Sequence, residues 1–242
     1  MKGKVSFMIS HHHKCIFVHI PKNAGQSVEH VFLNLLGLNW ETRAPLLLRY
    51  NDKPELGPPR LAHLKANEYV RYNYLTQEMF DDYFKFAFVR NPWSRTVSMY
   101  KYLGYSKKMD FKSFLFEHLK DRMFENKRWF VGPQSDFIYG EDGKLLVDFV
   151  GKFEDLQNGF NSVCENIGIP PTELPHVNES QNKDIDPNSN LKATIKNFLR
   201  AYKQKSQPDF RNWREYYDNE SIDCVSQLYK NDIKLFEYDF QR

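Results

Sequence analysis

A short apolar segment that turns directly into an amphipathic helix constrains the fold of this chain more than any other feature. Residues 14–20, KCIFVHI, are rich in β-branched and aromatic side chains and stop at Pro21, which is typical of a buried strand. Residues 25–37 follow closely, repeat their apolar side chains at helical spacing and end at Gly37. The pattern predicts a strand, a tight turn and a helix.

The rest of the chain repeats this alternation. Two more apolar runs, 84–89 and 145–153, indicate strands. Helical patterns cover residues 76–83, 92–104, 110–119, 154–167, 191–205 and 219–233. Strands that alternate with crossover helices favour an α/β fold with a central parallel sheet flanked by helices. No repeat or linker interrupts the pattern, so we expect a single domain over residues 1–242.

Composition narrows the class of protein. The chain has 242 residues and a formal net charge of +3, which allows a sizeable core but is too weakly basic to indicate a nucleic-acid partner. Its three cysteines lie far apart and the histidines at 11–13 lack metal-ligand spacing, so we expect neither a disulfide framework nor a bound metal. With no membrane-length apolar stretch and no signal-peptide pattern, we expect a cytoplasmic protein without a membrane span.

The first strand-to-helix turn has the composition of an anion cradle. Backbone N–H groups of residues 23–27 would point into the bend, and the helix that begins near Gly25 adds the positive end of its dipole. Ser27 offers a hydroxyl and Lys22 a mobile positive charge. The turn is not a Walker A loop, because the lysine precedes the glycine. A plain turn with a solvated lysine is the alternative.

A second turn of this kind follows the strand at 84–89. Arg90 ends the strand, Pro92 opens a helix, and Ser98 lies two turns along it. A guanidinium and a hydroxyl placed in this way can bind one anion together. The alternative is a capping arginine beside a serine that faces solvent. Because ligands of such sheets bind beyond the carboxyl ends of the strands, the two turns together predict a ligand with two separated phosphates.

These segments carry a family resemblance. Residues 19–29, HIPKNAGQSVE, resemble the 5′-phosphosulfate loop of the sulfotransferases that use 3′-phosphoadenosine 5′-phosphosulfate (PAPS), and residues 84–100 resemble their 3′-phosphate segment. Blocks of the carbohydrate-type branch, which includes heparan 2-O- and chondroitin-type enzymes and many bacterial relatives, are similar to residues 147–169, 174–180 and 216–240. The resemblance implies a P-loop-like sulfotransferase fold, PAPS as sulfuryl donor and a hydroxyl acceptor, either a glycan or a small alcohol or phenol.

The resemblance also implies roles for individual residues. Lys22 would contact the bridging oxygen of the phosphosulfate, while Arg90 and Ser98 would bind the 3′-phosphate. The 5′-phosphate would be held by Asn23, Ala24, Gly25, Gln26, Ser27 and Val28. Many relatives have threonine where this chain has Asn23 and Gln26, and glycine where it has Ala24. Asn23 and Gln26 therefore lack the hydroxyl contacts of those relatives, whereas backbone contacts survive the change.

Transfer to a hydroxyl needs a base, and His63 is the candidate. It lies between the two turns, and in the resembling family a histidine of the corresponding region has this role. A structural histidine is the alternative, with Glu68 or Asp136 as other bases. His19 is expected to be a strand histidine held by the backbone, and residues 134–136 to line the acceptor side. A nucleotide kinase and a non-catalytic nucleotide- or polyanion-binding module remain competing hypotheses.

Overall fold

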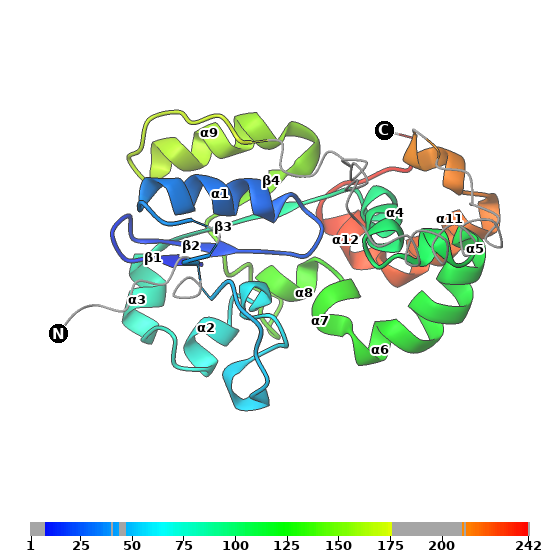
Figure 1. The fold of residues 1–242 in the computed structure, drawn as a ribbon, viewed down its shortest axis with the longest axis horizontal. Coiled ribbons are helices and arrows are strands. Elements are labelled where there is room, and N and C mark those ends of the chain that lie inside the picture. Colours follow the sequence, from blue (N-terminus) through cyan, green and yellow to red (C-terminus); the bar gives the residue numbers. More distant parts are fainter. Residues whose placement is uncertain (1–7, 40, 44–46, 176–209, 211, 242) are drawn as a thin grey trace, which may run out of the picture.

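The computed structural model describes residues 8–39, 41–43, 47–175, 210 and 212–241 (Figure 1). The basic helix predicted at 191–205 and most of the block at 174–180 lie outside the described residues. Among the described residues, no helix has the length and apolar character needed to cross a membrane.

A four-stranded sheet forms the centre of the fold, in the order β1-β2-β3-β4. Its strands are β1 (Ile9–Ser10), β2 (Cys15–Val18), β3 (Phe84–Val89) and β4 (Phe149–Lys152). β2, β3 and β4 are parallel, with Cys15 paired to Phe84 and Phe86 to Phe149. β1 runs antiparallel to β2, so the sheet is mixed, and the prediction of a parallel sheet was wrong at this edge. The polar residues 11–14 form the hairpin turn.

Helices cover both faces of the sheet. α1 (Gly25–Leu35) and α9 (Leu156–Asn166) lie together on one face, whereas the short helices α2 (Glu68–Arg71), α3 (Gln77–Asp82) and α8 (Ser135–Ile138) lie on the other (Figure 1). Phe32 and Phe160 meet edge to face between α1 and α9, with ring centroids 6.5 Å apart. Phe86 is fully buried between the layers, stacked on Phe17 at 5.1 Å. This aromatic core holds β2 and β3 in register at the centre of the sheet.

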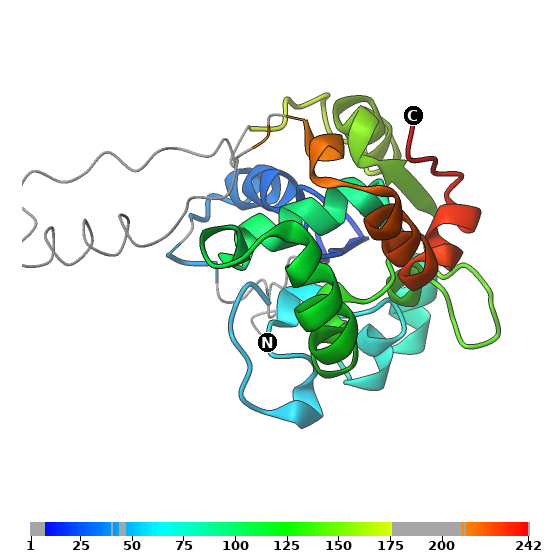
Figure 2. The same ribbon diagram turned by 90° about the vertical axis from the view of Figure 1, so that its right-hand side faces the viewer.

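A second group of helices lies beyond the carboxyl end of β3 (Figure 1 and Figure 2). It comprises α4 (Pro92–Tyr102), α5 (Phe111–Ser113), η5 (Phe114–Met123), α6 (Phe124–Asn126), α7 (Arg128–Val131), α11 (Asn219–Leu228) and α12 (Lys230–Leu235). These helices share a hydrophobic cluster of their own, built around Tyr100, Phe114 and Val225. Two clusters do not by themselves decide the number of domains, so the single domain stays a prediction.

Most predicted elements form, with different ends. The helix expected at 110–119 continues to Asn126, and its middle part, η5, has the wider hydrogen bonding of a π-helix. The helix expected at 219–233 divides into α11 and α12 at Tyr229, which is buried and donates its hydroxyl to the Val131 carbonyl at 2.7 Å. Both differences follow from packing within the second cluster, which local sequence does not encode.

Candidate active site

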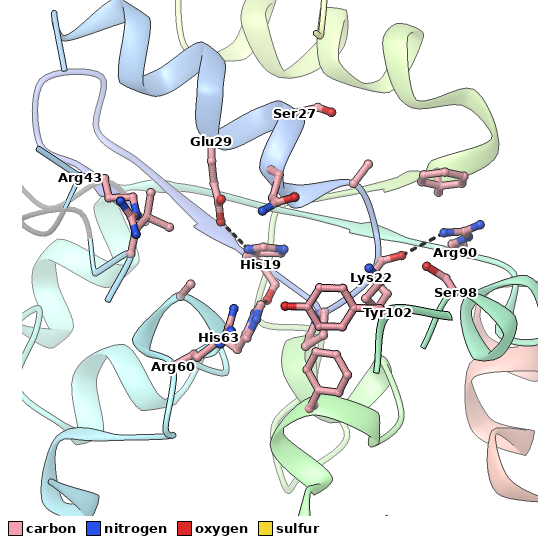
Figure 3. A pocket seen from close by; sticks show the side chains of 18 of the residues that line it. His19, Lys22, Ser27, Glu29, Arg43, Arg60, His63, Arg90, Ser98 and Tyr102 are labelled. Carbon is pink, nitrogen blue, oxygen red and sulfur yellow. Dashed lines mark hydrogen bonds and ion pairs between the residues drawn. The ribbon is translucent and has the colours of Figure 1, made fainter. Parts of the chain in front are cut away.

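A cavity of about 590 Å³ opens where β2 and β3 end. Its walls come from the turn after β2, the start of α1, the cavity-facing side of α4 and two segments between 43 and 63 (Figure 3). A volume of this size is within the range of small-molecule and cofactor sites. Lys22, Arg90, Ser98 and His63 all line it, so the structure brings together residues that lie far apart in the chain.

The turn after β2 has a conformation that suits anion binding. Lys22 and Ala24 have φ values of 71° and 59°, in the left-handed region that side chains rarely adopt. Alternation of left-handed residues turns successive N–H groups toward one concave side, and α1 begins directly afterwards at Gly25. Gly25, Gln26 and Ser27 all line the cavity beside Lys22 and Ala24.

Two residues predicted to hold the anion direct their side chains elsewhere. Asn23 is 1% exposed, and its Nδ2 donates to the Phe88 carbonyl at 2.7 Å and to Gln134 Oε1 at 2.8 Å. Val28 is buried in the core beneath α1. Neither side chain lines the cavity, because both pack into the interior of the fold, so the predicted contacts of these two residues with an anion would come from their backbone groups.

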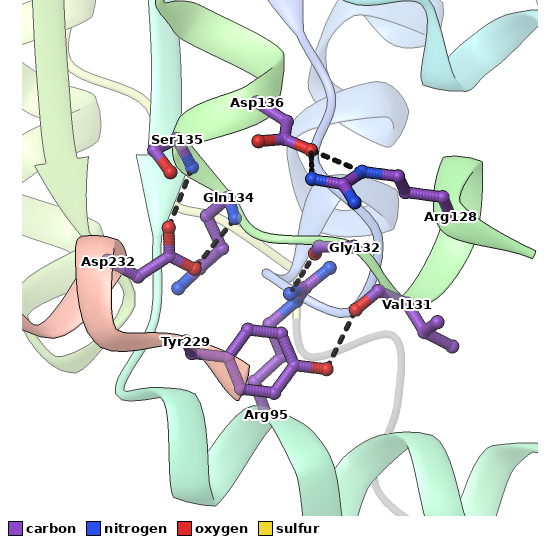
Figure 4. Close-up of polar contacts among 9 residues, drawn as sticks. All are labelled: Arg95, Arg128, Val131, Gly132, Gln134, Ser135, Asp136, Tyr229 and Asp232. Carbon is purple, nitrogen blue, oxygen red and sulfur yellow. Dashed lines mark hydrogen bonds and ion pairs between the residues drawn. The ribbon is translucent and has the colours of Figure 1, made fainter. Parts of the chain in front are cut away.

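Gln134 joins the two predicted anion-binding turns. Besides accepting from Asn23, its Oε1 accepts the Arg90 N–H at 2.8 Å, and its Nε2 donates to the Arg90 carbonyl at 2.8 Å. The N–H groups of Gln134 and Ser135 in turn donate to the buried carboxylate of Asp232, at 2.7 and 2.8 Å (Figure 4). Gln134 was expected on the acceptor side, but it is fully buried and structural. No local pattern in the sequence marks this role.

Arg95 holds the turn after β2 against the wall of the cavity. Its guanidinium is buried and donates to the carbonyls of Pro21, Gly132 and Phe130 at 3.0, 2.9 and 3.2 Å. Figure 4 shows the contact with Gly132.

The two alternative bases lie outside the cavity lining. Asp136 pairs with Arg128 at 2.8 Å, as Figure 4 also shows. Glu68 accepts the Lys65 N–H and also lies outside the cavity lining.

Lys22 and Arg90 place two desolvated cations in the cavity. The Lys22 ammonium lies 4.0 Å from the centre of the Tyr102 ring, and burial together with repulsion from Arg90 lowers its pKa to about 8. Arg90 stacks on Phe153 at 4.0 Å and donates to Ser94 Oγ at 3.0 Å and to the Lys22 carbonyl at 3.2 Å. Burial lowers the pKa of Arg90 to about 10. A bound anion would relieve the repulsion between these charges.

The other charged or titratable residues that line the cavity include three arginines and the histidines His19 and His63. Figure 3 shows Lys22 between Arg90 and the histidines, with Arg43 and Arg60 beyond them at the end opposite Arg90. Arg60 donates to the Tyr50 hydroxyl at 2.8 Å, and Arg49, which precedes Tyr50 in the chain, also lines the cavity. These three arginines are scattered along a polar loop, and no local pattern marks them.

His63 is placed and held as a neutral imidazole. Its Nδ1 lies 3.1 Å from the His19 carbonyl, which can only accept, so Nδ1 carries the proton and Nε2 keeps its lone pair. Burial, with further repulsion from neighbouring cations, holds the pKa of His63 well below its usual value of 6.5. A buried imidazole with a free lone pair can accept a proton at neutral pH.

His19 also faces the cavity, contrary to the expectation of an ordinary strand histidine. Its Nδ1 lies 2.6 Å from Glu29 Oε1, and its ring lies against Gly25. Glu29 precedes Phe32 by three residues and so shares the buried face of α1. An acid on the apolar face of a predicted helix, such as Glu29, is the sequence signal that could have identified this buried pair.

Two half-buried cations beside a helix N-terminus, with a neutral imidazole in the same cavity, give a charge pattern that suits an anionic ligand. The family model described as Sulfotransferase family matches residues 5–239, so the chain belongs to this family, whose members transfer sulfuryl groups. An uncharacterised protein of Archaeoglobus fulgidus is 34% identical over 101 residues, which are 40% of this chain and 78% of that protein. No solved structure matches the chain. Within the described residues, no group of three or more His, Cys, Asp and Glu side chains is arranged to hold a metal ion.

The contact between His19 and Gly25 predicts the effect of a single methyl group. A Cβ on Gly25 would overlap the His19 imidazole, so we expect Gly25→Ala to lower the free energy of unfolding by about 1–3 kcal/mol, measured by urea denaturation. His19→Ala removes the obstacle, and the double variant should therefore lose less than the sum of the single variants. Strictly additive losses would show that the ring does not occupy this space.

Proposed function

We propose that the protein transfers the sulfuryl group of PAPS to a hydroxyl of a carbohydrate acceptor, with a P-loop-like donor site. The observation that carries the proposal is the pair of anion-binding turns in one cavity, with Lys22 at one and Arg90 and Ser98 at the other. Gln134 holds the turns at a constant separation. A donor with phosphates at its 5′ and 3′ positions has the matching charge pattern.

The donor would be held at both ends. The N–H groups of Gly25 and Gln26 at the start of α1 would bind the 5′-phosphate together with the Ser27 hydroxyl, with help from the helix dipole. The Ser27 N–H itself donates to the Ala24 carbonyl at 3.0 Å. Arg90 would bind the 3′-phosphate together with the Ser98 hydroxyl, which faces the same end of the cavity (Figure 3). Lys22 lies between these contacts and would reach the oxygen that bridges phosphorus and sulfur.

The residues then suit in-line transfer through a loose transition state, in which positioning and charge stabilisation supply most of the rate. The acceptor oxygen forms the new bond to sulfur while the bond from sulfur to the 5′-phosphate breaks. His63 Nε2 takes the proton of the acceptor hydroxyl, and the Lys22 ammonium stabilises the charge that develops on the leaving phosphate.

The far end of the cavity supports a glycan as acceptor. Arg43, Arg49 and Arg60 line it with Tyr50, whose ring is 78% exposed and lies 4.8 Å from the Arg60 guanidinium carbon. Exposed aromatic rings offer apolar faces to sugars, and guanidinium groups bind carboxylates and sulfates. The pattern favours an acidic glycan over a neutral one.

The donor assignment predicts how nucleotides stabilise the protein. We expect the product 3′-phosphoadenosine 5′-phosphate (PAP) to raise the melting temperature by mass action, and AMP, which lacks the 3′-phosphate, to raise it far less. Arg90→Gln and Ser98→Ala should reduce this difference, whereas the exposed Arg122→Gln should preserve it. Equal stabilisation by PAP and AMP in the wild-type protein would remove the role of Arg90 and Ser98.

Lys22 should be needed for transfer more than for binding. Lys22→Gln should lower the transfer of label from radiolabelled PAPS by orders of magnitude, because its contact is strongest as charge develops on the leaving group. Because a pKa of about 8 means that Lys22 loses its charge above that pH, wild-type affinity for PAP should fall as pH rises through 8. Calorimetry should find this fall absent in Lys22→Gln and present in Lys107→Gln.

The same transfer assay tests the acceptor. It is run with paired glycans that differ in one carboxylate or sulfate, and with a simple alcohol and a phenol. We expect acidic glycans to accept label best. Preferential labelling of the phenol would replace the carbohydrate acceptor, and PAP binding without transfer to any acceptor would favour a binding module.

The lowered pKa of His63 predicts how the transfer rate depends on pH on the acidic side. A lowered pKa means that the imidazole stays neutral down to a pH well below 6.5, so the wild-type rate should not change between about pH 6.5 and 7.5 and should fall only at more acidic pH. His63→Asn should lower turnover by about 10²–10⁴-fold and leave stabilisation by PAP intact. A rate that climbs through pH 6.5, or loss of PAP binding in His63→Asn, would contradict the assignment.

A further inference from the structure

His19 and Glu29 form a buried pair in the wall of the cavity, and neither has a role in the reaction described above. His19 directly follows β2 and Glu29 lies in the second turn of α1, so the pair joins the strand to the helix on either side of the anion-binding turn. Their side chains are 8% and 3% exposed, and His19 Nδ1 lies 2.6 Å from Glu29 Oε1. Both residues line the cavity (Figure 3).

The His19 ring is held from several sides. It stacks on Phe17 with ring centroids 5.4 Å apart, and it meets the His63 ring edge to face at 4.6 Å. Glu29 Oε1 faces Nδ1 at 2.6 Å without the alignment of a hydrogen bond, while Nε2 lies against Gly25, where a side chain would collide with it. Nε2 therefore lies at the start of α1, between Lys22 and His63, where the sulfuryl group of the proposed donor would lie (Figure 3).

The two histidines have opposite partners at Nδ1. A backbone carbonyl faces Nδ1 of His63, which leaves that ring neutral with a lone pair at Nε2. A carboxyl group faces Nδ1 of His19, which leaves Nε2 as the ring nitrogen that can donate a hydrogen bond into the cavity. Among the described residues that line the cavity, Glu29 is the one acid, and it lies beside His19.

We propose that His19 donates a hydrogen bond from Nε2 to a sulfuryl oxygen of the donor, and that Glu29 is the positioning residue that orients the ring. This inference rests on the proposed function and adds a residue that contacts the group in transfer. No proton is transferred at His19, because the acceptor proton goes to His63. The hydrogen bond holds the sulfuryl group in line between the acceptor oxygen and the leaving phosphate as transfer proceeds.

The test compares variants that differ in the hydrogen-bond donor at the position of His19 Nε2. His19→Leu removes the N–H, His19→Gln keeps an amide N–H near the position of Nε2, and Glu29→Gln keeps the shape of Glu29 without its charge. His118→Leu and Glu117→Gln, far from the cavity, are the matched controls. Turnover of radiolabelled PAPS at saturating donor is measured beside affinity for PAP, which lacks the sulfuryl group.

We expect His19→Leu to lower kcat by about 10²-fold, the usual effect of a small misplacement of the reacting groups, with affinity for PAP unchanged. His19→Gln should recover part of that loss, and Glu29→Gln should lower kcat without weakening PAP binding. Both controls should match the wild-type protein. A merely structural pair would not separate kcat from PAP affinity or distinguish His19→Gln from His19→Leu.

Three results would overturn the inference. Wild-type turnover in His19→Leu would remove His19 while leaving the proposed function intact. A parallel fall in kcat and PAP affinity in Glu29→Gln and His19→Gln would make the pair structural, and these milder variants decide the matter if His19→Leu does not fold. A wild-type protein that binds PAP and transfers no sulfuryl group would overturn the proposed function and this inference together.

Discussion

The amide of Gln134 is the contact on which the site depends. It bonds to Asn23 in the turn after β2 and to both backbone groups of Arg90 in the turn after β3, and the backbone N–H of Gln134 donates to the Asp232 carboxylate. These groups are buried, so each lost bond would leave a desolvated polar atom unpaired. A network of this kind permits few arrangements of its members, and it therefore sets the distance between the two turns.

Because this hydrogen-bond network fixes the two turns, two positive charges can face the same cavity. Lys22 and Arg90 are desolvated near each other, and the pKa of each is lowered by burial. Placing like charges close together costs free energy, which the rest of the fold offsets. The surrounding contacts, including the carbonyls that accept hydrogen bonds from Arg95, also hold Lys22 and Ala24 in their left-handed backbone conformation. Because the cations are already in position, binding an anion requires little reorganisation, which is the condition for stabilising charge during transfer.

The local elements were predictable where short-range physics decides them. β2, β3 and α1 follow from apolar periodicity, and α4 begins at Pro92 with Asn91 capping its first turn. β1 escaped prediction because a two-residue strand has too little pattern to detect. The π-helical hydrogen bonds of η5 and the break at Tyr229 depend on packing between helices that are distant in sequence.

The sequence by itself determined the two strand-to-helix turns, their cations Lys22 and Arg90, and the family. The reason is that a strand, a turn residue and a helix cap act over a few neighbouring residues. Only the tertiary structure decided which polar side chains face the cavity. Asn23 turns into the core, Gln134 joins the turns rather than lining the acceptor side, and His19 meets Glu29 beside Gly25. The first two outcomes depend on burial and on partners far away in the chain, and no local pattern contains that information. The position of Glu29 on the apolar face of α1 was a local signal of a buried partner, but only the tertiary structure identified that partner as His19.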